Sequence, residues 1–339
     1  MDTPPLPAKK SSSGFWITIT LLVLALLVSV GFNLILSLSM AWNSWTWTDE
    51  GGGEDEFPVM EETWSYGSGD AKVVRIAVEG VILREMESDG FFEQTADKIT
   101  GILHQIRAAK NDEDVRAIIL EVDSPGGGIT ESDEIYAELL SFKSSAEGRK
   151  VVVFMRDLAA SGGYYVAMAG DWLIAQPTTV VGSIGVIMQT INFKGLGEKL
   201  GIKDTTIKSG ENKDLLNPFI DVPPEQMALL QGVVDNMYGH FFDIVKEARG
   251  IEEATLKPLA DGRIFVSKDA LDLGLVDQIG YWEDAVAKTA EVLGESAVKV
   301  VRFEKHDEFL SLLSLLQTPV GMSRITEAMR PRLMYLWKP

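Results

Sequence analysis

A long uncharged stretch near the N-terminus constrains this chain most. No charged residue occurs from Ser11 to Thr48, and the part from Phe15 to Met40 is almost entirely apolar. A helix of that length can cross the hydrocarbon core of a bilayer. Tryptophans, whose amphipathic rings favour the headgroup level, flank the apolar part; they are Trp16, Trp42, Trp45 and Trp47. We therefore expect a single transmembrane anchor over residues 14–42.

The charges on either side of the anchor predict its direction. Lys9 and Lys10 precede it, whereas residues 49–62 carry seven carboxylates and no base. Because positive residues remain on the cytoplasmic side, we expect residues 1–13 in the cytoplasm and the rest of the chain outside it, in the periplasm or at the cell exterior. A cleaved signal peptide is the alternative. Its apolar region would span only about 7 to 15 residues and end in small residues, not tryptophans.

Composition excludes several classes of function. The chain has 339 residues, with 50 acidic and 31 basic side chains, for a net charge of −19. A nucleic-acid partner would need clustered Lys and Arg, so we expect none. Cysteine is absent, which excludes disulfides, thiolate zinc sites and a cysteine nucleophile. No spacing of His, Asp and Glu indicates a metal site, and we expect no metal and no cofactor.

The chain after the anchor divides into three parts. Residues 43–71 are acidic and glycine-rich, which is typical of a solvated linker. From residue 72 to 300, apolar β-branched segments alternate with helical periods, which predicts an α/β domain with mostly parallel strands. The expected strands are 73–82, 117–122, 150–155, 172–175, 205–208 and 298–301. The expected helices are 95–106, 132–142, 161–169, 224–248 and 268–273. Residues 301–339 form a tail that packs on a neighbouring subunit, on its own body or on the membrane surface.

Two glycine-rich segments follow expected strands, where the ligands of such sheets bind. In residues 124–128, Ser-Pro-Gly-Gly-Gly, three glycines after a proline can turn amides outward into an anion-binding hollow. In residues 160–163, Ala-Ser-Gly-Gly, Ser161 would project its hydroxyl at a helix N-terminus, which favours a developing oxyanion. Each segment alone also fits a tight turn or a helix cap. Together they predict a serine nucleophile with an oxyanion hole.

Histidine is a poor candidate for the base of this serine. The chain has only His104, His240 and His306, and none follows a segment of the expected site. A Ser-His-Asp triad is therefore disfavoured. Gly-x-Ser-x-Gly, the motif of another class of serine hydrolase, does not occur either.

A lysine base requires burial, because an ordinary lysine pKa of about 10.4 leaves almost no neutral amine at pH 7. Ser296 to Lys299 matches Ser-x-x-Lys, but it runs into an expected strand and does not place both side chains on one helix face. Lys213 is the better candidate, since the apolar segment 215–219 follows it and could desolvate it. Glu211 and Asp214 would have to point away, and an exposed loop lysine is the alternative.

Five segments resemble, in order, the signal peptide peptidase A family, membrane-bound serine proteases of the ClpP/crotonase-like fold. They are Asp-Ser-Pro-Gly-Gly-Gly at 123–128, Ala-Ser-Gly-Gly-Tyr-Tyr at 160–165, Gly-Ser-Ile-Gly-Val at 182–186, Ser-Gly at 209 through Lys-Asp at 213, and Asp-Gly-Arg-Ile-Phe at 261 through Gly-Leu-Val-Asp at 274. The resemblance covers residues 72 to 280. It implies a repeated ββα superhelix preceded by a membrane helix, in the short form of the family, which assembles into ring or dome homo-oligomers.

The resemblance also implies the roles of individual residues. Ser161 would be the nucleophile and Lys213 the general base. Gly126, Gly127 and Gly162 would form the oxyanion hole, and Ser183 would orient the lysine amine, although a plain turn serine is the alternative. The implied activity is hydrolysis of signal-peptide remnants and other apolar peptides through an acyl-enzyme. The alternatives are an acyl-CoA hydratase on the same fold, a related membrane-bound protease acting on membrane proteins, and an inactive ring-forming scaffold.

Overall fold

The computed structural model describes residues 20–24, 26–34, 60–84, 97–304 and 332–336, which belong to two units divided at residue 55. In the first unit, residues 20–24 and 26–34 are helical, and their leucine and valine side chains are exposed. Among the described residues, no helix combines the length and the hydropathy that a membrane crossing requires. The remainder of the expected anchor lies outside the described residues, so the anchor stays a prediction.

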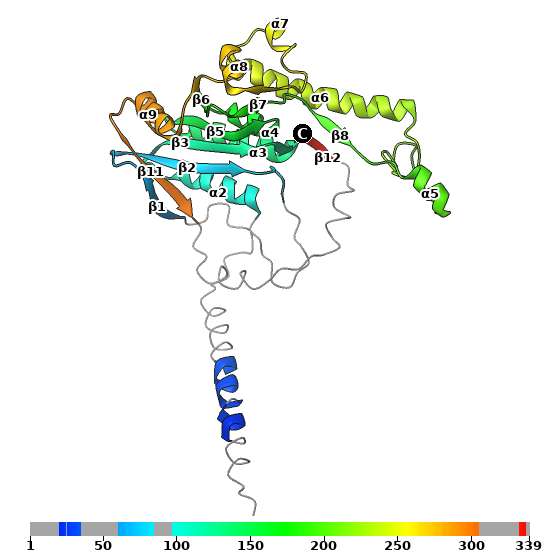
Figure 1. Ribbon diagram of the computed structural model, residues 1–339, viewed down its shortest axis with the longest axis horizontal. Coiled ribbons are helices and arrows are strands. Elements are labelled where there is room, and N and C mark those ends of the chain that lie inside the picture. Colours follow the sequence, from blue (N-terminus) through cyan, green and yellow to red (C-terminus); the bar gives the residue numbers. More distant parts are fainter. Residues whose placement is uncertain (1–19, 25, 35–59, 85–96, 305–331, 337–339) are drawn as a thin grey trace, which may run out of the picture. The chain divides into compact units, whose positions relative to one another are not determined.

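The second unit is built on a nine-stranded sheet (Figure 1). Its main order is β1-β11-β2-β3-β5-β6-β10, with β7 beside β5 and β9 beside β7. Every neighbouring pair from β11 to β10 is parallel, and so is the pair of β5 and β7. The two antiparallel pairs of this sheet are β1 with β11 and β9 with β7. The strands are β1 (Glu61–Tyr66), β2 (Ala71–Glu79), β3 (Val115–Ser124), β5 (Lys150–Ala160), β6 (Trp172–Ala175), β7 (Val180–Gly182), β9 (Ile264–Val266), β10 (Gln278–Ile279) and β11 (Val298–Glu304). The expected α/β class with mostly parallel strands is confirmed.

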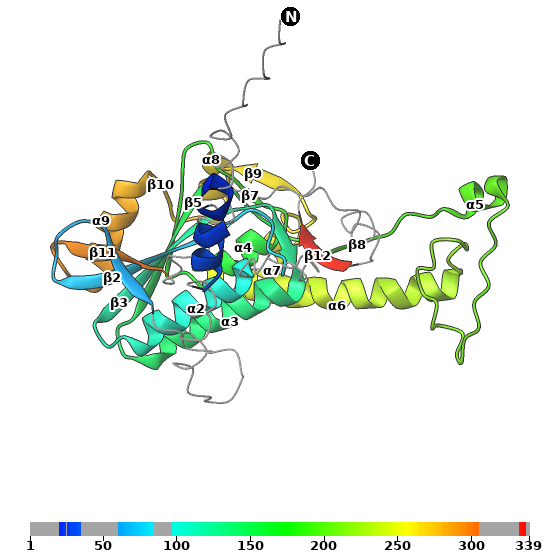
Figure 2. The same ribbon diagram turned by 90° about the horizontal axis from the view of Figure 1, so that it is seen from below.

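Helices cover both faces of this sheet. Along β3, Ile118 and Leu120 enter one hydrophobic core while Ile119 enters a second, because successive strand side chains point to opposite faces. The first core includes residues of α2 (Lys98–Asn111), α3 (Ile129–Ser145), α4 (Gly162–Ala167), α6 (Pro224–Arg249), α7 (Glu253–Leu256) and α8 (Ser267–Asp272). The second core is closed by α9 (Trp282–Leu293). Figure 2 shows α2, α3 and α6 along one side of the sheet.

Most expected elements are present, with ends shifted by a few residues, but two differences matter. Residues 202–208, which include the expected strand 205–208, have no regular structure and are exposed, since no neighbouring strand pairs with them. Conversely, β1 lies inside the segment expected to be a linker. Its acidic surroundings suggested a solvated tether, but Glu62 pairs with Lys72 and Lys299, so the folded body begins before residue 72.

A small second sheet has the order β4 (Gly126–Gly128), β12 (Arg332–Leu336) and β8 (Ile187–Gln189). The central strand β12 comes from the C-terminal tail and pairs antiparallel with both neighbours. Its register sets Met334 opposite both Gly128 and Ile187. Of the three expected locations for the tail, the described part thus occupies its own body.

An arm made of residues 190–223 connects β8 to α6. It contains the short helix α5 (Lys194–Leu200), and both views show α5 well away from the sheet (Figures 1 and 2). Two contacts close the arm on itself: the Phe193 amide donates to the Pro218 carbonyl at 2.6 Å, and Lys194 pairs with Asp221 at 2.5 Å. The arm carries Lys213.

Candidate active site

Ser161 occupies a sharp turn between β5 and α4. Its backbone has φ 54° and ψ −118°, a conformation that L-residues rarely adopt and that typically marks functional sites. The side chain is 1% exposed and forms no hydrogen bond with any described residue. No fully buried side-chain oxygen of the described chain lacks a partner, so this hydroxyl retains contact with solvent. The turn therefore presents an unpaired hydroxyl at a helix N-terminus.

The amide of Gly162 is a free donor beside this hydroxyl. It is the first amide of α4, and the first turn of a helix leaves its N–H groups without helical partners. No hydrogen bond from the Gly162 amide to another described residue occurs. A Cβ on Gly162 would lie 2.5 Å from Ser132 Oγ and 3.1 Å from the Gly127 nitrogen. The absent side chain thus lets the two glycine-rich segments meet, as the sequence predicted.

The three glycines of β4 have different partners. The Gly126 amide donates to Ser124 Oγ at 3.0 Å, and the Gly128 amide donates to the Ile82 carbonyl at 2.7 Å. The Gly126 carbonyl accepts from the Ile82 amide at 3.0 Å. Because the backbone groups of a strand alternate in direction, the Gly127 amide faces the opposite edge. Gly127 is therefore better placed than Gly126 to donate to an oxyanion.

Ser183 lies next to the turn of Ser161. β5 and β7 pair so that Ala160 is opposite Gly182, and the Ser161 amide donates to the Gly182 carbonyl at 2.8 Å. Ser183 also has a positive φ, 53°, and its side chain is buried without a hydrogen bond to the described chain. Two strained serines with unpaired hydroxyls thus stand at adjacent strand ends.

Lys213 is exposed in a turn of the arm and is not brought to Ser161. Its amine forms no hydrogen bond or ion pair with the described residues. The neighbouring Asp214 is held by Lys208 at 2.7 Å, and this bond lowers the pKa of the Asp214 carboxyl. Burial of its amine would require a surface from outside the described chain.

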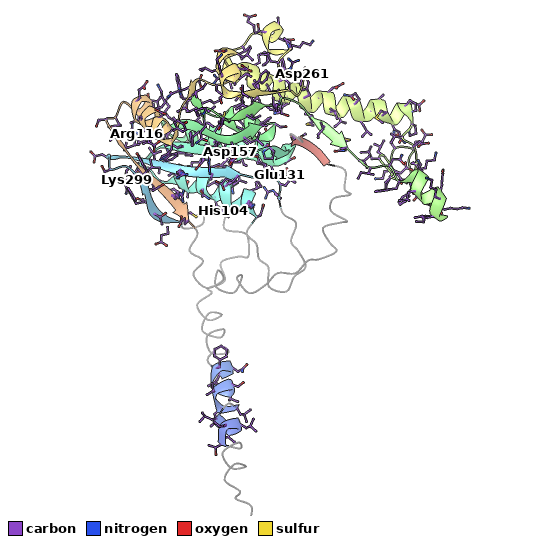
Figure 3. The ribbon with its side chains drawn as sticks, in the orientation of Figure 1. His104, Arg116, Glu131, Asp157, Asp261 and Lys299 are labelled. Atoms are coloured by element: carbon purple, nitrogen blue, oxygen red, sulfur yellow. The ribbon has the colours of Figure 1, made fainter. Side chains whose placement is uncertain are left out.

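Among the described residues, none of the other basic side chains weighed in the sequence forms a hydrogen bond with the Ser161 side chain. Lys299 lies in β11 and pairs with Glu62. In Figure 3 it lies far from β12, which pairs with the glycines of β4, so the Ser-x-x-Lys match does not supply a base for Ser161. His104 lies on α2 (Figure 3). His240 Nε2 lies 3.7 Å from Asp133 Oδ1, to which Tyr165 donates at 2.5 Å. His306 lies outside the described residues.

Comparison with known proteins assigns the family. The model of peptidase family S49 matches residues 143–295, which include Ser161, Ser183 and Lys213. A candidate protease of Methanocaldococcus jannaschii is 33% identical over 217 residues, which cover 64% of this chain and 69% of that protein. The chain belongs to peptidase family S49. This confirms the protease family that the sequence motifs resembled.

Other S49-like relatives carry more specific names. A candidate signal peptide peptidase SppA of Enterococcus faecium is 39% identical over 228 residues, which cover 67% of this chain and 65% of that protein. The chloroplastic serine protease SPPA of Arabidopsis thaliana is 34% identical over 187 residues, covering 55% of this chain and 27% of that protein. This chain thus spans less than two thirds of the length of either.

Two serines that the sequence analysis did not select support the S49 site. Ser124 Oγ donates to the Gly80 carbonyl at 2.6 Å and accepts from the Gly126 amide, so it fixes the turn before β4. Ser132 Oγ donates to the Gly128 carbonyl at 2.8 Å and stands against Gly162. Both side chains are fully buried, which the sequence does not show; its only signal was their position within or just after the glycine-rich segment 124–128.

The Asp-Gly-Arg-Ile-Phe motif of the S49 chain supports Ser183. The Ser183 amide donates to the Arg263 carbonyl at 2.7 Å, and the Gly262 amide donates to the Ile184 carbonyl at 3.1 Å. Asp261 holds the Arg263 guanidinium through two hydrogen bonds, which lower the pKa of the Asp261 carboxyl to about 2. The motif therefore fixes the backbone of the Ser183 loop.

Asp123 sits at the end of β3, beside the glycines of β4. Burial raises the pKa of its carboxyl, and the nearby Asp157 raises it further. Asp157 is labelled near the carboxyl ends of the strands in Figure 3. The folded protein therefore disfavours the ionised form of the Asp123 carboxyl beside the site. Among the described residues, no group of three His, Asp or Glu side chains is arranged to hold a metal ion.

Proposed function

We propose that this S49 chain is a membrane-anchored serine endopeptidase that cleaves signal-peptide remnants and other apolar peptides with a Ser161–Lys213 dyad. One observation carries the proposal: Ser161 is held at a positive φ with an unpaired hydroxyl beside the free amide of Gly162. The names of the Enterococcus faecium and Arabidopsis thaliana relatives support the serine chemistry and the substrate class.

The chemistry follows from the two glycine-rich segments. Neutral Lys213 takes the proton of the Ser161 hydroxyl, and the oxygen attacks the peptide carbonyl. The amides of Gly162 and Gly127 stabilise the oxyanion, which preorganised donors can do at no reorganisation cost during the reaction. The lysine then gives its proton to the leaving amine, and water hydrolyses the acyl ester. Ser183 orients the lysine amine from the adjacent strand end.

The dyad forms between two copies of the chain. Lys213 makes no contact with Ser161 of its own chain, but it lies on an arm that extends from the body. The arm and the start of α6 expose many large apolar side chains, among them Ile191, Leu196, Leu200, Ile202, Ile207 and Met227, and Ile207 is 98% exposed. Exposed apolar surface of this extent is typical of protein interfaces. A neighbouring copy would bury the arm and desolvate Lys213.

The N-terminal segment supports attachment to a cell membrane. The described helical residues 20–24 and 26–34 expose ten leucine, valine and phenylalanine side chains, which water does not favour: Leu21, Leu22, Val23, Leu24, Leu26, Leu27, Val28, Val30, Phe32 and Leu34. The flanking charges support a cytoplasmic position for residues 1–13 and a position outside the cytoplasm for the S49 domain. Apolar signal-peptide remnants are left in the same membrane, so the anchor brings enzyme and substrate together.

A fluorophosphonate probe tests this function on the full chain in detergent. Wild-type protein should be labelled at Ser161, Ser161→Ala should not be labelled, and Lys213→Ala should be labelled at least a hundredfold more slowly. Lys208→Ala is the matched control, since it removes a lysine of the same arm, and its labelling should stay near the wild-type rate. Equal labelling of wild type and Ser161→Ala would contradict the nucleophile, and no labelling of wild type would favour the scaffold alternative.

Mixing two inactive variants tests the shared dyad. In a mixed oligomer, a Lys213→Ala copy can supply Ser161 while a Ser161→Ala copy supplies Lys213. We expect peptide hydrolysis to recover to roughly a quarter of the wild-type rate when the two are co-expressed in equal amounts, as random pairing predicts. If the variants form mixed oligomers and recover no activity, the dyad lies within one chain.

A further inference from the structure

The short helix α4 follows the Ser161 turn and depends on its neighbours for its position. It has only six residues, and an isolated helix of that length is not stable in water. The Tyr165 amide donates to the Ser161 carbonyl at 2.8 Å, which closes the first turn of the helix on the strained residue. A strained conformation persists only where the surrounding structure fixes it. The contacts that hold α4 therefore also hold the Ser161 hydroxyl.

The Tyr165 side chain joins α4 to the two helices beside it, α3 and α6 (Figure 2). It is fully buried, and its ring centroid lies 5.4 Å from that of Tyr136 on α3 and 5.1 Å from that of Phe241 on α6. The hydroxyl at the end of the ring donates to Asp133 Oδ1 on α3 at 2.5 Å. A carboxylate acceptor makes such a bond about twice as strong as a neutral one. One strong polar bond therefore fixes α4 against α3.

The same part of α3 contacts the start of α4. Ser132 precedes Asp133 and donates to the Gly128 carbonyl at 2.8 Å. Its Oγ is the atom that a Cβ on Gly162 would approach most closely, at 2.5 Å. α3 begins directly after β4, the strand whose glycines border the Ser161 turn. Two contacts about one helical turn apart, at Gly162 and at Tyr165, therefore set the position of α4 relative to β4.

We propose that Asp133 and Tyr165 are positioning residues for the reaction: their hydrogen bond holds the Ser161 hydroxyl in one geometry relative to the oxyanion amides of Gly162 and Gly127. The proposal rests on the function proposed above and adds two residues to it. A misplacement of about 1 Å between reacting groups can slow a reaction about a hundredfold. Loss of the bond should slow the reaction while the chain still folds, because the apolar contacts of the Tyr165 ring remain.

His240 of α6 lies near the same carboxylate and supplies the matched control. Its Nε2 is 3.7 Å from Asp133 Oδ1, which is beyond hydrogen-bond distance. The side chains are 57% exposed for His240 and 49% for Asp133, so water competes with this pair. His240→Gln therefore changes a neighbour of Asp133 and leaves the bond to Tyr165 in place.

The rate of fluorophosphonate labelling tests the proposal on the full chain in detergent. Tyr165→Phe and Asp133→Ala should each label Ser161 about tenfold more slowly than wild type, with the same final extent of labelling. The double variant should be no slower than either single variant, because both remove the same bond. Asp133→Asn keeps an acceptor oxygen for the Tyr165 hydroxyl, so its rate should stay within about threefold of wild type. His240→Gln should label at the wild-type rate.

The separation of rate from extent excludes a merely structural role. Misfolded protein lowers the extent of labelling, whereas misplacement of the hydroxyl lowers the rate. In peptide hydrolysis, the same two variants should lower kcat about tenfold with little change in KM. Wild-type rates in Tyr165→Phe and Asp133→Ala, or a loss in the extent of labelling alone, would overturn the proposal.

Amide exchange gives a readout that does not depend on the chemistry. Exchange at residues 165–169 should be at least about fivefold faster in Tyr165→Phe and Asp133→Ala, and unchanged in Asp133→Asn and His240→Gln. If exchange is unchanged in the first two variants, the bond does not hold α4 and the proposal is wrong. If exchange rises as expected but wild-type protein is never labelled, the bond does hold α4 and the serine protease function proposed above fails.

Discussion

The amide of Ser161 donates to the carbonyl of Gly182 at 2.8 Å, and this bond joins the turn of Ser161 to the loop of Ser183. It extends the parallel pairing of β5 and β7 by one residue, into the region where the backbone after each strand turns to positive φ. The sheet therefore fixes the two serines relative to each other. Ser161 and Ser183 are two of the three described residues other than glycine with positive φ.

The strain at Ser161 predicts an unusual order of stability. Such a φ destabilises a residue that has a Cβ by about 1 to 2 kcal/mol, whereas glycine adopts it without this strain. We expect the free energy of unfolding of Ser161→Gly to exceed that of Ser161→Ala by about 1 kcal/mol, with a correspondingly higher denaturant midpoint. Both variants should be inactive. Chemical denaturation of the two variants, followed by circular dichroism, measures the difference. A less stable glycine variant would show that the turn is not strained as described.

Two substitutions at Ser183 distinguish the effect of its hydroxyl from the effect of its backbone conformation. Ser183→Gly suits the φ of 53° and removes the hydroxyl, whereas Ser183→Ala removes the hydroxyl but keeps the Cβ. If the hydroxyl orients Lys213, both variants should lose about ten- to a hundredfold in kcat with little change in KM. Near wild-type kcat in Ser183→Gly would identify Ser183 as a plain turn residue. Thermal unfolding controls for loss of structure.

The local geometry of the candidate site was predictable because glycine and serine patterns act over a few residues. The turn at Ser161, the approach of Gly162 to β4 and the strands before them follow from segments of five or six residues. The expected strand 205–208 was wrong for the opposite reason: its β-branched residues lack a neighbouring strand, and only tertiary structure reveals that. Lys213 also depends on long-range structure, since its distance from Ser161 is set by the arm.

The pairing of β12 shows the same limit. Its pairing joins residues 332–336 to strands about 150 to 210 positions earlier in the chain. The tail alone is short, basic and apolar, a composition that fits a membrane surface, a subunit contact or a strand equally well. Only the pairing with β4 and β8 identifies the tail segment as a strand. The sequence could predict that the tail packs somewhere but not that it lies at the candidate site.

Gly162 should tolerate no side chain, and a second substitution can show why. Gly162→Ala places a Cβ 2.5 Å from Ser132 Oγ and 3.1 Å from the Gly127 nitrogen. We expect it to lose at least a hundredfold in kcat/KM and about 1 to 3 kcal/mol of stability. Adding Ser132→Ala removes the closest contact, so stability should partly recover while activity does not, because the contact with the Gly127 backbone remains. Full recovery of activity would contradict the role of this contact.

The carboxyl of Asp123 predicts a pH-dependent gain in stability. Its pKa is raised, first by burial and then by Asp157, so the folded protein disfavours the ionised form. Below the unfolded pKa of about 3.9, the carboxyl is protonated in both states and costs nothing. As the pH rises through the folded pKa, ionisation destabilises the folded state. Asp123→Asn keeps an acceptor oxygen, so it should raise Tm by a few degrees at pH 7 and leave it unchanged at pH 3.

The matched control for this prediction is Asp261→Asn. Arg263 lowers the pKa of the Asp261 carboxyl to about 2, so its ionised form is favoured in the folded state. The stability that this contributes is present above the unfolded pKa of about 3.9 and is lost as the pH falls towards 2. The control should therefore lower Tm slightly at pH 7, in the opposite direction to Asp123→Asn. Thermal scans of both variants at pH 3 and pH 7 compare the signs, and a decrease for Asp123→Asn at pH 7 would show that its carboxylate stabilises the site.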